Sequence, residues 1–294
     1  MIVIRYEGVI YRPPSEFDSL IIQATIGCPH NKCSFCNMYK DRKFKIRSIN
    51  HIKKDLEYAK DIYGEELEKI FFSDGNTILM KTKDLLDILS YAKSLFPNLK
   101  RATMYGSAQY INLKSLEELK ELRNHGLTRI HCGMESGDDE VLGKIHKGYT
   151  GNEMIKAGKL IKNAGIELSL YYIVGLGGRE LFSNHAINSA KVINEIKPDF
   201  VRLRTLMPRM GTELYEEYKR GDFQLLNPHE ALEETKVLIN NINEINTCLV
   251  SDHISNYWNI EGLLLRDKKS MIEEIDYALS LDSSNFRNPE SGSL

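Results

Sequence analysis

Short apolar and β-branched runs alternate along the chain with longer segments whose apolar residues recur at helical spacing. The runs predict buried strands at residues 19–27, 69–73, 101–106, 129–134, 166–174 and 200–206. The intervening segments predict helices at residues 48–63, 81–96, 113–124, 138–146, 152–163 and 179–196. Six consecutive strand-then-helix units indicate an α/β fold with a parallel sheet and right-handed crossovers.

The pattern changes after residue 206. We expect helices at 212–220, 229–243 and 267–280 and a short extra strand at 247–250. This predicts four regions: a lead-in at 1–19 that its prolines favour as extended, a core at 20–206, an α/β extension at 207–281, and a disordered polar tail at 282–294. The extension would close the open side of a partial barrel.

Composition narrows the class of protein. A chain of 294 residues with no compositional break is typical of one large α/β domain, and its net charge of -2 argues against a nucleic-acid-binding surface. No apolar run is long enough to span a membrane, and the N-terminus lacks the order of a signal peptide. Unpaired, clustered cysteines indicate a reducing compartment, so we expect a cytoplasmic protein. The oligomeric state stays open.

Three of the five cysteines, Cys28, Cys33 and Cys36, lie within the nine residues C-P-H-N-K-C-S-F-C. Three thiolates on one loop favour a soft metal site, foremost an iron–sulfur cluster. A four-iron cubane has four ligand positions, so three cysteines leave one iron open to a small molecule. Zinc held by the three cysteines and His30 is the alternative, although no second ligand pair follows. Cys132 and Cys248 are expected to be small buried apolar residues.

The loop resembles the cluster loop of the radical S-adenosylmethionine (SAM) superfamily. Its spacing is C-x4-C-x2-C where the superfamily usually has C-x3-C-x2-C, and Phe35 supplies the aromatic residue. The stretch G-M-E-S-G at 133–137 resembles the subgroup that includes oxygen-independent coproporphyrinogen oxidase, the methylthiotransferases and the elongator-type enzymes. The resemblance covers about residues 20–206 and implies a partial (β/α)6 TIM-type barrel.

The resemblance implies a [4Fe-4S] cluster on the three cysteines and SAM on the remaining iron. The ends of the strands would hold SAM: Ser73, Asp74 or Gly75 near its amino group, Glu135 and Ser136 near its ribose or methionine part, and Val174 and Gly175 near its adenine. Phe35, Ser107 and Arg204 complete the expected cofactor contacts. An ordinary β-turn remains the alternative for S-D-G-N at 73–76. Lys144 and Lys147 are expected on a helix surface.

Substrate contacts are expected from Tyr105 and Gln109 at the end of the third strand and from Arg202 on the sixth. Arg202 and Arg204 share a strand face, and an inward arginine could pair with the SAM carboxylate or with an anionic substrate. His253 and Tyr257 lie in the dense stretch S-D-H-I-S-N-Y-W. A capping turn with a packed tryptophan is the alternative there.

The resemblance implies a radical SAM enzyme, an oxidoreductase that reductively cleaves SAM. The resulting 5'-deoxyadenosyl radical would abstract hydrogen from a small-molecule substrate, and a flavodoxin or ferredoxin-type protein would donate the electron. RNA modification is an alternative within enzymes. An iron–sulfur electron carrier or metal-dependent regulator is the alternative outside them.

Overall fold

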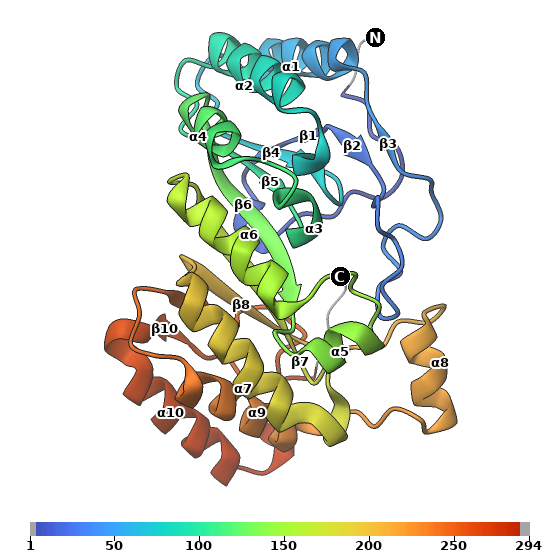
Figure 1. The fold of residues 1–294 in the computed structure, drawn as a ribbon, viewed down its shortest axis with the longest axis vertical. Coiled ribbons are helices and arrows are strands. Elements are labelled where there is room, and N and C mark those ends of the chain that lie inside the picture. The colour runs from blue at the N-terminus through green and yellow to red at the C-terminus, as the bar shows by residue number, and fades with distance from the viewer. Residues whose placement is uncertain (1–3, 289–294) are drawn as a thin grey trace. The chain divides into compact units, whose positions relative to one another are not determined.

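The computed structural model describes residues 4–288, which form two compact units (Figure 1). Within these residues, the first unit comprises 4–31, 38–132 and 160–168, and the second comprises 32–37, 133–159 and 169–288. Strand β6 (Leu127–Glu135), helix α6 (Gly151–Asn163) and strand β7 (Glu167–Val174) each pass from one unit into the other along the chain.

The first unit is a parallel sheet in the order β1-β4-β5-β6. Its strands β1 (Leu20–Gln23), β4 (Lys69–Ser73) and β5 (Arg101–Tyr105) precede α1 (Ile49–Tyr63), α2 (Thr82–Leu95) and α4 (Leu116–Asn124), respectively. A short antiparallel pair, β2 (Thr25–Ile26) and β3 (Lys45–Ile46), follows β1. Two short elements, η2 (Thr77–Leu79) and α3 (Ala108–Ile111), begin directly after strands β4 and β5.

The two faces of this sheet differ in chemistry because side chains alternate along each strand. One face carries fully buried apolar residues, among them Ile22, Ile70 and Met104, and is buried together with the apolar sides of the helices. The other face carries buried polar groups, among them Gln23 and Thr103. The polar face and the carboxyl ends of its strands are therefore available to build a site.

The second unit continues the parallel pattern with β7, β8 (Phe200–Thr205) and β9 (Cys248–Val250). Strand β10 (Glu261–Leu263) adds to β9 in antiparallel orientation. The helices of this unit are α5 (Asp139–Lys144), α7 (Gly178–Ile196), α8 (Glu213–Arg220), α9 (Pro228–Asn241) and α10 (Leu264–Ser280).

The predicted fold class is confirmed: all six predicted core strands are present, and a C-terminal α/β extension follows them. Within the described residues, no strand pairing closes the barrel. The helix predicted at 113–124 begins at Leu116, because Ser115 and Glu118 form a capping box there. The sequence analysis missed α3, β3 and β10, which are too short to show a clear period.

The expectation of a disordered tail at 282–294 needs correction over the described residues 282–288. They contain a 3-10 turn, η3 (Ser283–Asn285), and the buried Phe286 packs against His229 and Trp258 at ring-centre distances of 4.9 and 5.8 Å. Burial of one aromatic ring offsets the polar composition that suggested disorder. Residues 289–294 lie outside the described part of the chain.

The lead-in is bound to the polar face of the first unit through Glu16, which closes a 3-10 turn, η1 (Pro14–Glu16), where extended chain was expected. The fully buried carboxylate accepts hydrogen bonds from Arg101 and His131, each at 2.8 Å, and from Ser19 at 2.7 Å. Burial opposes ionisation, but the bonds with His131, Ser19 and Arg101 lower the pKa of Glu16 to about 2.

We expect Glu16→Gln to lower the free energy of unfolding at pH 7 by about 3 kcal/mol. The substitution removes the buried carboxylate charge and leaves Arg101 and His131 without it. The lowered pKa of Glu16 stabilises the wild type above the ordinary value of 4.5, and this contribution is lost as pH falls toward 2. Urea unfolding between pH 7 and 3 measures both effects. Equal pH dependence of the variant and the wild type would contradict the assignment.

Candidate functional site

The end of β4 and the exit from β1 are tied together by Asp74. Its Oδ2 accepts hydrogen bonds from Gln23 Nε2 at 2.8 Å and from the Gly27 backbone N–H at 3.4 Å. Its own N–H donates to Thr25 Oγ1 at 3.2 Å. S-D-G-N is thus a turn that fixes where the cysteine loop leaves the sheet.

Three buried oxygen atoms at the ends of β4 and β5 have no hydrogen-bond partner among the described residues: Ser73 Oγ, Asp74 Oδ1 and Ser107 Oγ. Burial raises the pKa of Asp74 to about 6, although the bonds from Gln23 and Gly27 oppose the rise. Buried polar groups are normally satisfied, so unpartnered ones in one region indicate a ligand with matching polar groups. Oxygen acceptors suit an ammonium group, such as the amino group of a SAM methionine.

Cys28 comes shortly after β2 in the chain and contacts Gly75 and Asn76 of this turn. Its Sγ receives the Asn31 backbone N–H at 3.5 Å and Asn76 Nδ2 at 3.9 Å. Asn76 Oδ1 in turn accepts the N–H of Ser107 at 2.6 Å. A Cβ on Gly75 would lie 3.0 Å from Cys28 Cβ and 2.9 Å from the Gly27 carbonyl oxygen, so only glycine fits there.

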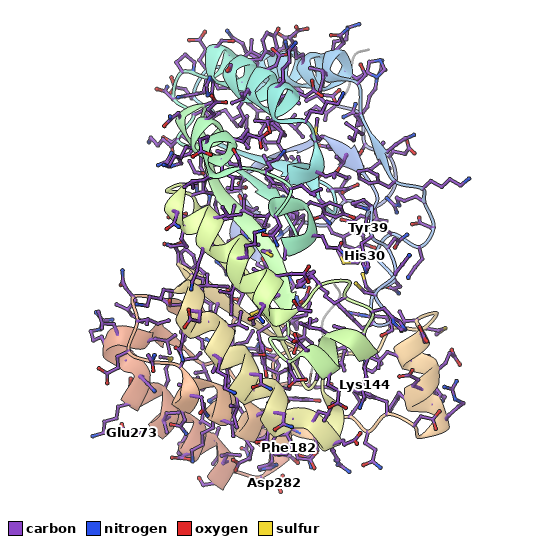
Figure 2. The ribbon with its side chains drawn as sticks, in the orientation of Figure 1. His30, Tyr39, Lys144, Phe182, Glu273 and Asp282 are labelled. Atoms are coloured by element: carbon purple, nitrogen blue, oxygen red, sulfur yellow. The ribbon has the colours of Figure 1, made fainter. Side chains whose placement is uncertain are left out.

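Cys33 and Cys36 belong to the second unit. His30 and Tyr39, which are labelled in Figure 2, flank residues 32–37 in the sequence. The intervening Ser34 donates its N–H to the Ile145 carbonyl and accepts the N–H of Leu214, both at 3.0 Å. Both thiols are half-buried. No three His, Cys, Asp or Glu side chains converge on a single metal-ion position among residues 4–288.

Lys147 was expected on a helix surface, but it is buried, because α5 ends at Lys144 and the chain turns inward. Its Nζ lies 2.9 Å from Glu135 Oε1 and 6.0 Å from the ring centre of Phe35. Burial lowers the pKa of Lys147, but the Glu135 carboxylate more than offsets this and holds it well above its usual value. Glu135 is therefore already paired with Lys147. Lys144, labelled in Figure 2, is exposed as expected.

Ser136 has a structural role. Its hydroxyl donates to His185 Nδ1 at 2.8 Å and accepts the Asp138 N–H at 2.9 Å. His185 Nε2 donates to the Ile173 carbonyl at 3.1 Å, and burial lowers the pKa of His185 to about 4, so the ring is neutral. The hydroxyl therefore donates its proton within the protein, and the expected contact of Ser136 with SAM stays a prediction.

The sequence analysis missed Glu234, a fully buried carboxyl group on α9. Its Oε1 accepts hydrogen bonds from Tyr172 Oη at 2.7 Å and from the Gly175 N–H at 3.0 Å, while its Oε2 has no partner within residues 4–288. Burial raises the pKa of Glu234 to about 8. A glutamate within the apolar spacing of a helix gave no signal in the sequence. The bond from the Gly175 N–H to Glu234 holds this glycine in place, and its φ of +83° turns the chain away from β7.

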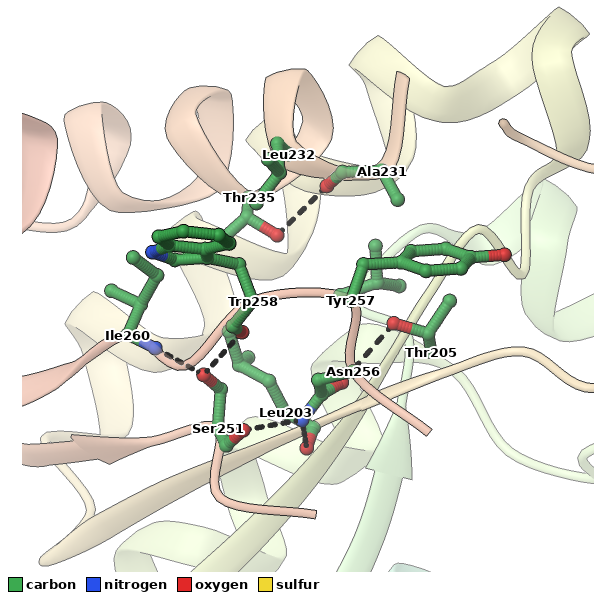
Figure 3. A pocket seen from close by; sticks show the side chains of 11 residues that line it. Leu203, Thr205, Ala231, Leu232, Thr235, Ser251, Asn256, Tyr257, Trp258 and Ile260 are labelled. Atoms are coloured by element: carbon green, nitrogen blue, oxygen red, sulfur yellow. Dashed lines mark hydrogen bonds between the residues drawn. The ribbon is translucent and has the colours of Figure 1, made fainter. Parts of the chain in front are cut away.

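Val174 and Tyr257 border a cavity of about 20 Å³ beside α9 (Figure 3). That volume is room for about one water molecule, so the cavity is no substrate site. The Val174 side chain thus faces the helices. Asn256 donates to the carbonyls of Leu203 and Ser251, both at 2.9 Å, as a capping turn would. This segment therefore closes the end of β8.

Tyr105 and Gln109, the expected substrate contacts from the third strand, lie on β5 and α3 of the first unit. Tyr105 packs edge-on against Phe71, with ring centres 5.1 Å apart, on the polar face of the sheet. Cys132 is fully buried as expected, whereas Cys248 is only partly buried.

Arg202 and Arg204 occupy alternate positions on β8, so they share the face opposite Leu203. The guanidinium carbon of Arg204 lies 5.2 Å from the ring centre of Tyr171, and that of Arg202 lies 5.5 Å from the ring centre of Phe200. His253 is near this face. Burial, followed by the charges of Arg204, Arg209 and Arg287, lowers the pKa of His253 to about 4.

The family model for the radical SAM superfamily matches residues 22–181, which include the cysteine loop and the ends of the first five core strands. The chain belongs to the radical SAM superfamily. It is therefore an enzyme of the class that uses a [4Fe-4S] cluster and SAM. No helix within residues 4–288 is long and apolar enough to cross a membrane.

Curated relatives of this radical SAM protein differ in function. It is 30% identical over 118 residues to a tRNA uridine(34) acetyltransferase of Methanocaldococcus jannaschii, which is 40% of this chain and 22% of that protein. The chain thus spans about a fifth of the length of that relative. It is 25% identical over 273 residues to a biotin synthase of Methanococcus maripaludis, covering 85% of this chain and 79% of the relative.

Solved structures support the same fold. Coproporphyrinogen III oxidase (HemN) from Escherichia coli superposes with a TM-score of 0.59 at 16% identity, over 76% of this chain and 52% of HemN. Methylornithine synthase (PylB) superposes with a TM-score of 0.53 at 15% identity, over 91% of this chain and 84% of PylB.

We expect Gly75→Ala to lower the iron content of anaerobically reconstituted protein by more than half, because its Cβ would displace Cys28 or the Gly27 carbonyl. Gly143→Ala on α5 is the matched control, since its Cβ would have no heavy atom within 4 Å. Iron analysis checks both variants, and circular dichroism checks that both fold. Full iron content in folded Gly75→Ala would show that the contact does not position Cys28.

We expect Glu234→Gln to remove a pH dependence of stability. The folded protein holds a proton on Glu234 up to a pKa of about 8, whereas the unfolded chain releases it near 4.5, so the wild type loses stability as pH rises between these values. Glutamine resembles the protonated acid, so the variant should match the wild type at pH 4.5 and be more stable at pH 9. Urea unfolding measures this, and equal slopes would refute it.

Proposed function

We propose that this radical SAM enzyme reductively cleaves SAM and uses the resulting 5'-deoxyadenosyl radical to take hydrogen from a small-molecule substrate. The unpartnered oxygens of Ser73, Asp74 and Ser107 carry this proposal, since they lie at the strand ends next to Cys28. They provide buried acceptors for the amino group of SAM in a protein whose family uses that cofactor.

Cys28, Cys33 and Cys36 would hold the cluster, one thiolate on each of three irons, and SAM would occupy the fourth. When bound, these groups supply the redox and radical chemistry, and the residues of this chain fix their positions. Asp74 and Gly75 fix the exit of β1, Asn76 directs an N–H toward Cys28, and Lys147 faces the ring of Phe35 between the second and third cysteines. The electron would come from a flavodoxin or ferredoxin-type partner.

Coverage of the relatives favours a small-molecule substrate over RNA. The biotin synthase relative, named for a small-molecule product, matches over most of its length, whereas the tRNA-modifying relative matches over about a fifth. The chain also has a net charge of -2, which does not favour general attraction of nucleic acid.

Cys36→Ala should lose both the cluster absorbance and the conversion of SAM to 5'-deoxyadenosine after anaerobic reconstitution and reduction with dithionite. Two cysteines cannot hold a site-differentiated four-iron cluster in the expected way. Cys248→Ala is the matched control and should retain both, because Cys248 lies on β9 outside the cluster loop. Chromatography of the nucleoside products measures the reaction.

A wild-type protein that binds SAM but yields no 5'-deoxyadenosine would refute the proposed cleavage. The opposite pattern between the two cysteine variants would show that the cluster uses other thiols.

A further inference from the structure

In the second unit, Arg202 and Arg204 lie on the polar face of β7 and β8. Neither has a carboxylate partner among the described residues. Arg202 is buried, with 9% of its surface exposed, and Arg204 is half-buried. Neither forms an ion pair with Asp or Glu among residues 4–288. A buried guanidinium without a counter-charge is costly, so such a group indicates a missing anion.

The donors of these arginines are largely unused. Arg202 Nε donates to Ser169 Oγ at 3.2 Å, which satisfies one of its five N–H groups. Arg204 forms no hydrogen bond with another residue in the described part of the chain, and its guanidinium carbon lies 5.2 Å from the ring centre of Tyr171. An aromatic ring can support a guanidinium while leaving its N–H edges free for bidentate contact with an oxyanion.

The surrounding groups increase the positive potential. Arg209 and Arg287 are exposed, and their charges, with that of Arg204, help to lower the pKa of His253 to about 4 after the larger effect of burial. Among the described residues, the guanidinium of Arg287 donates only to the backbone carbonyls of His253 and Asn256. This clustering occurs although the whole chain has a net charge of -2.

We propose that Arg202 and Arg204 bind an anionic group, a carboxylate or a phosphate, of the enzyme's small-molecule substrate. This inference rests on the proposed function, since it assigns the substrate class of that enzyme. The two side chains alternate on one strand, so their Cα atoms lie about 7 Å apart and both can reach one oxyanion. They lie beyond residues 22–181, the part that matches the superfamily, as expected for a substrate contact specific to this chain.

The test measures the midpoint of thermal unfolding, Tm, of anaerobically reconstituted protein. Sodium phosphate and sodium succinate are titrated separately to 20 mM, with sodium chloride holding ionic strength constant. If a bound oxyanion has a Kd of about 1 mM, Tm should rise by about 3 °C. The anion that gives the larger rise distinguishes phosphate from carboxylate.

Arg204→Gln and Arg202→Gln should each remove most of this rise. Arg204→Lys should retain a smaller part of it, because lysine keeps the charge but loses the planar donors. Arg220→Gln is the matched control: Arg220 is an exposed arginine of the same unit that already pairs with Asp222 at 2.8 Å. Its variant should keep the full response.

Equilibrium dialysis with SAM separates the substrate from the cofactor. Arg204→Gln should bind SAM within about twofold of the wild type, whereas a tenfold loss, which corresponds to about 1.4 kcal/mol, would show that the arginine binds the SAM carboxylate and would overturn the proposal. Equal phosphate and chloride responses in the wild type would also overturn it. A selective anion response in a protein that cannot cleave SAM would support the anion site and refute the proposed function alone.

Discussion

The Asp74 carboxylate is the contact on which the candidate site in the first unit depends. It joins two loops that are 47 residues apart in sequence by accepting the Gly27 N–H and the Gln23 amide. Parallel strands bring their carboxyl ends to one edge, so a group at the end of β4 can hold the exit of β1. Gly75 then permits a close approach to Cys28 that any larger residue would prevent. The position of the first cysteine is thus set by the sheet.

Side chains alternate along the strands, so in both units the apolar residues that stabilise the fold and the polar residues of the candidate sites lie on opposite faces of the sheet. In the first unit, Ile70 and Phe72 are buried on one face, while Ser73 ends the opposite one. In the second unit, Leu203 faces the cavity beside α9, while Arg202 and Arg204 occupy the other face. The apolar faces stabilise the fold by burial, so polar groups on the opposite faces can serve a ligand.

The features that this chain shares with the radical SAM superfamily and the features proposed as its own lie in different parts of the chain. The superfamily match covers the cysteine loop and the turns after β4 and β6, which suit the cofactors. The arginines of β8 and the segment that closes it lie outside the match. Glu234 and His185 show that some buried polar groups near the strand ends bond the backbone, since Glu234 accepts the Gly175 N–H and His185 donates to the Ile173 carbonyl.

The sequence by itself determined the six core strands, their helices and the three clustered cysteines, because strand period, helix spacing and cysteine spacing are local properties. Only the tertiary structure decided that Lys147 is buried against Glu135, that Ser136 bonds His185, and that Phe286 packs on Trp258. It also bonded Glu234 to the Gly175 N–H and left Arg204 without a carboxylate partner in the described part of the chain. These contacts join residues that are 12 to 59 positions apart, and no local pattern records which distant group will satisfy a buried charge or hydrogen bond.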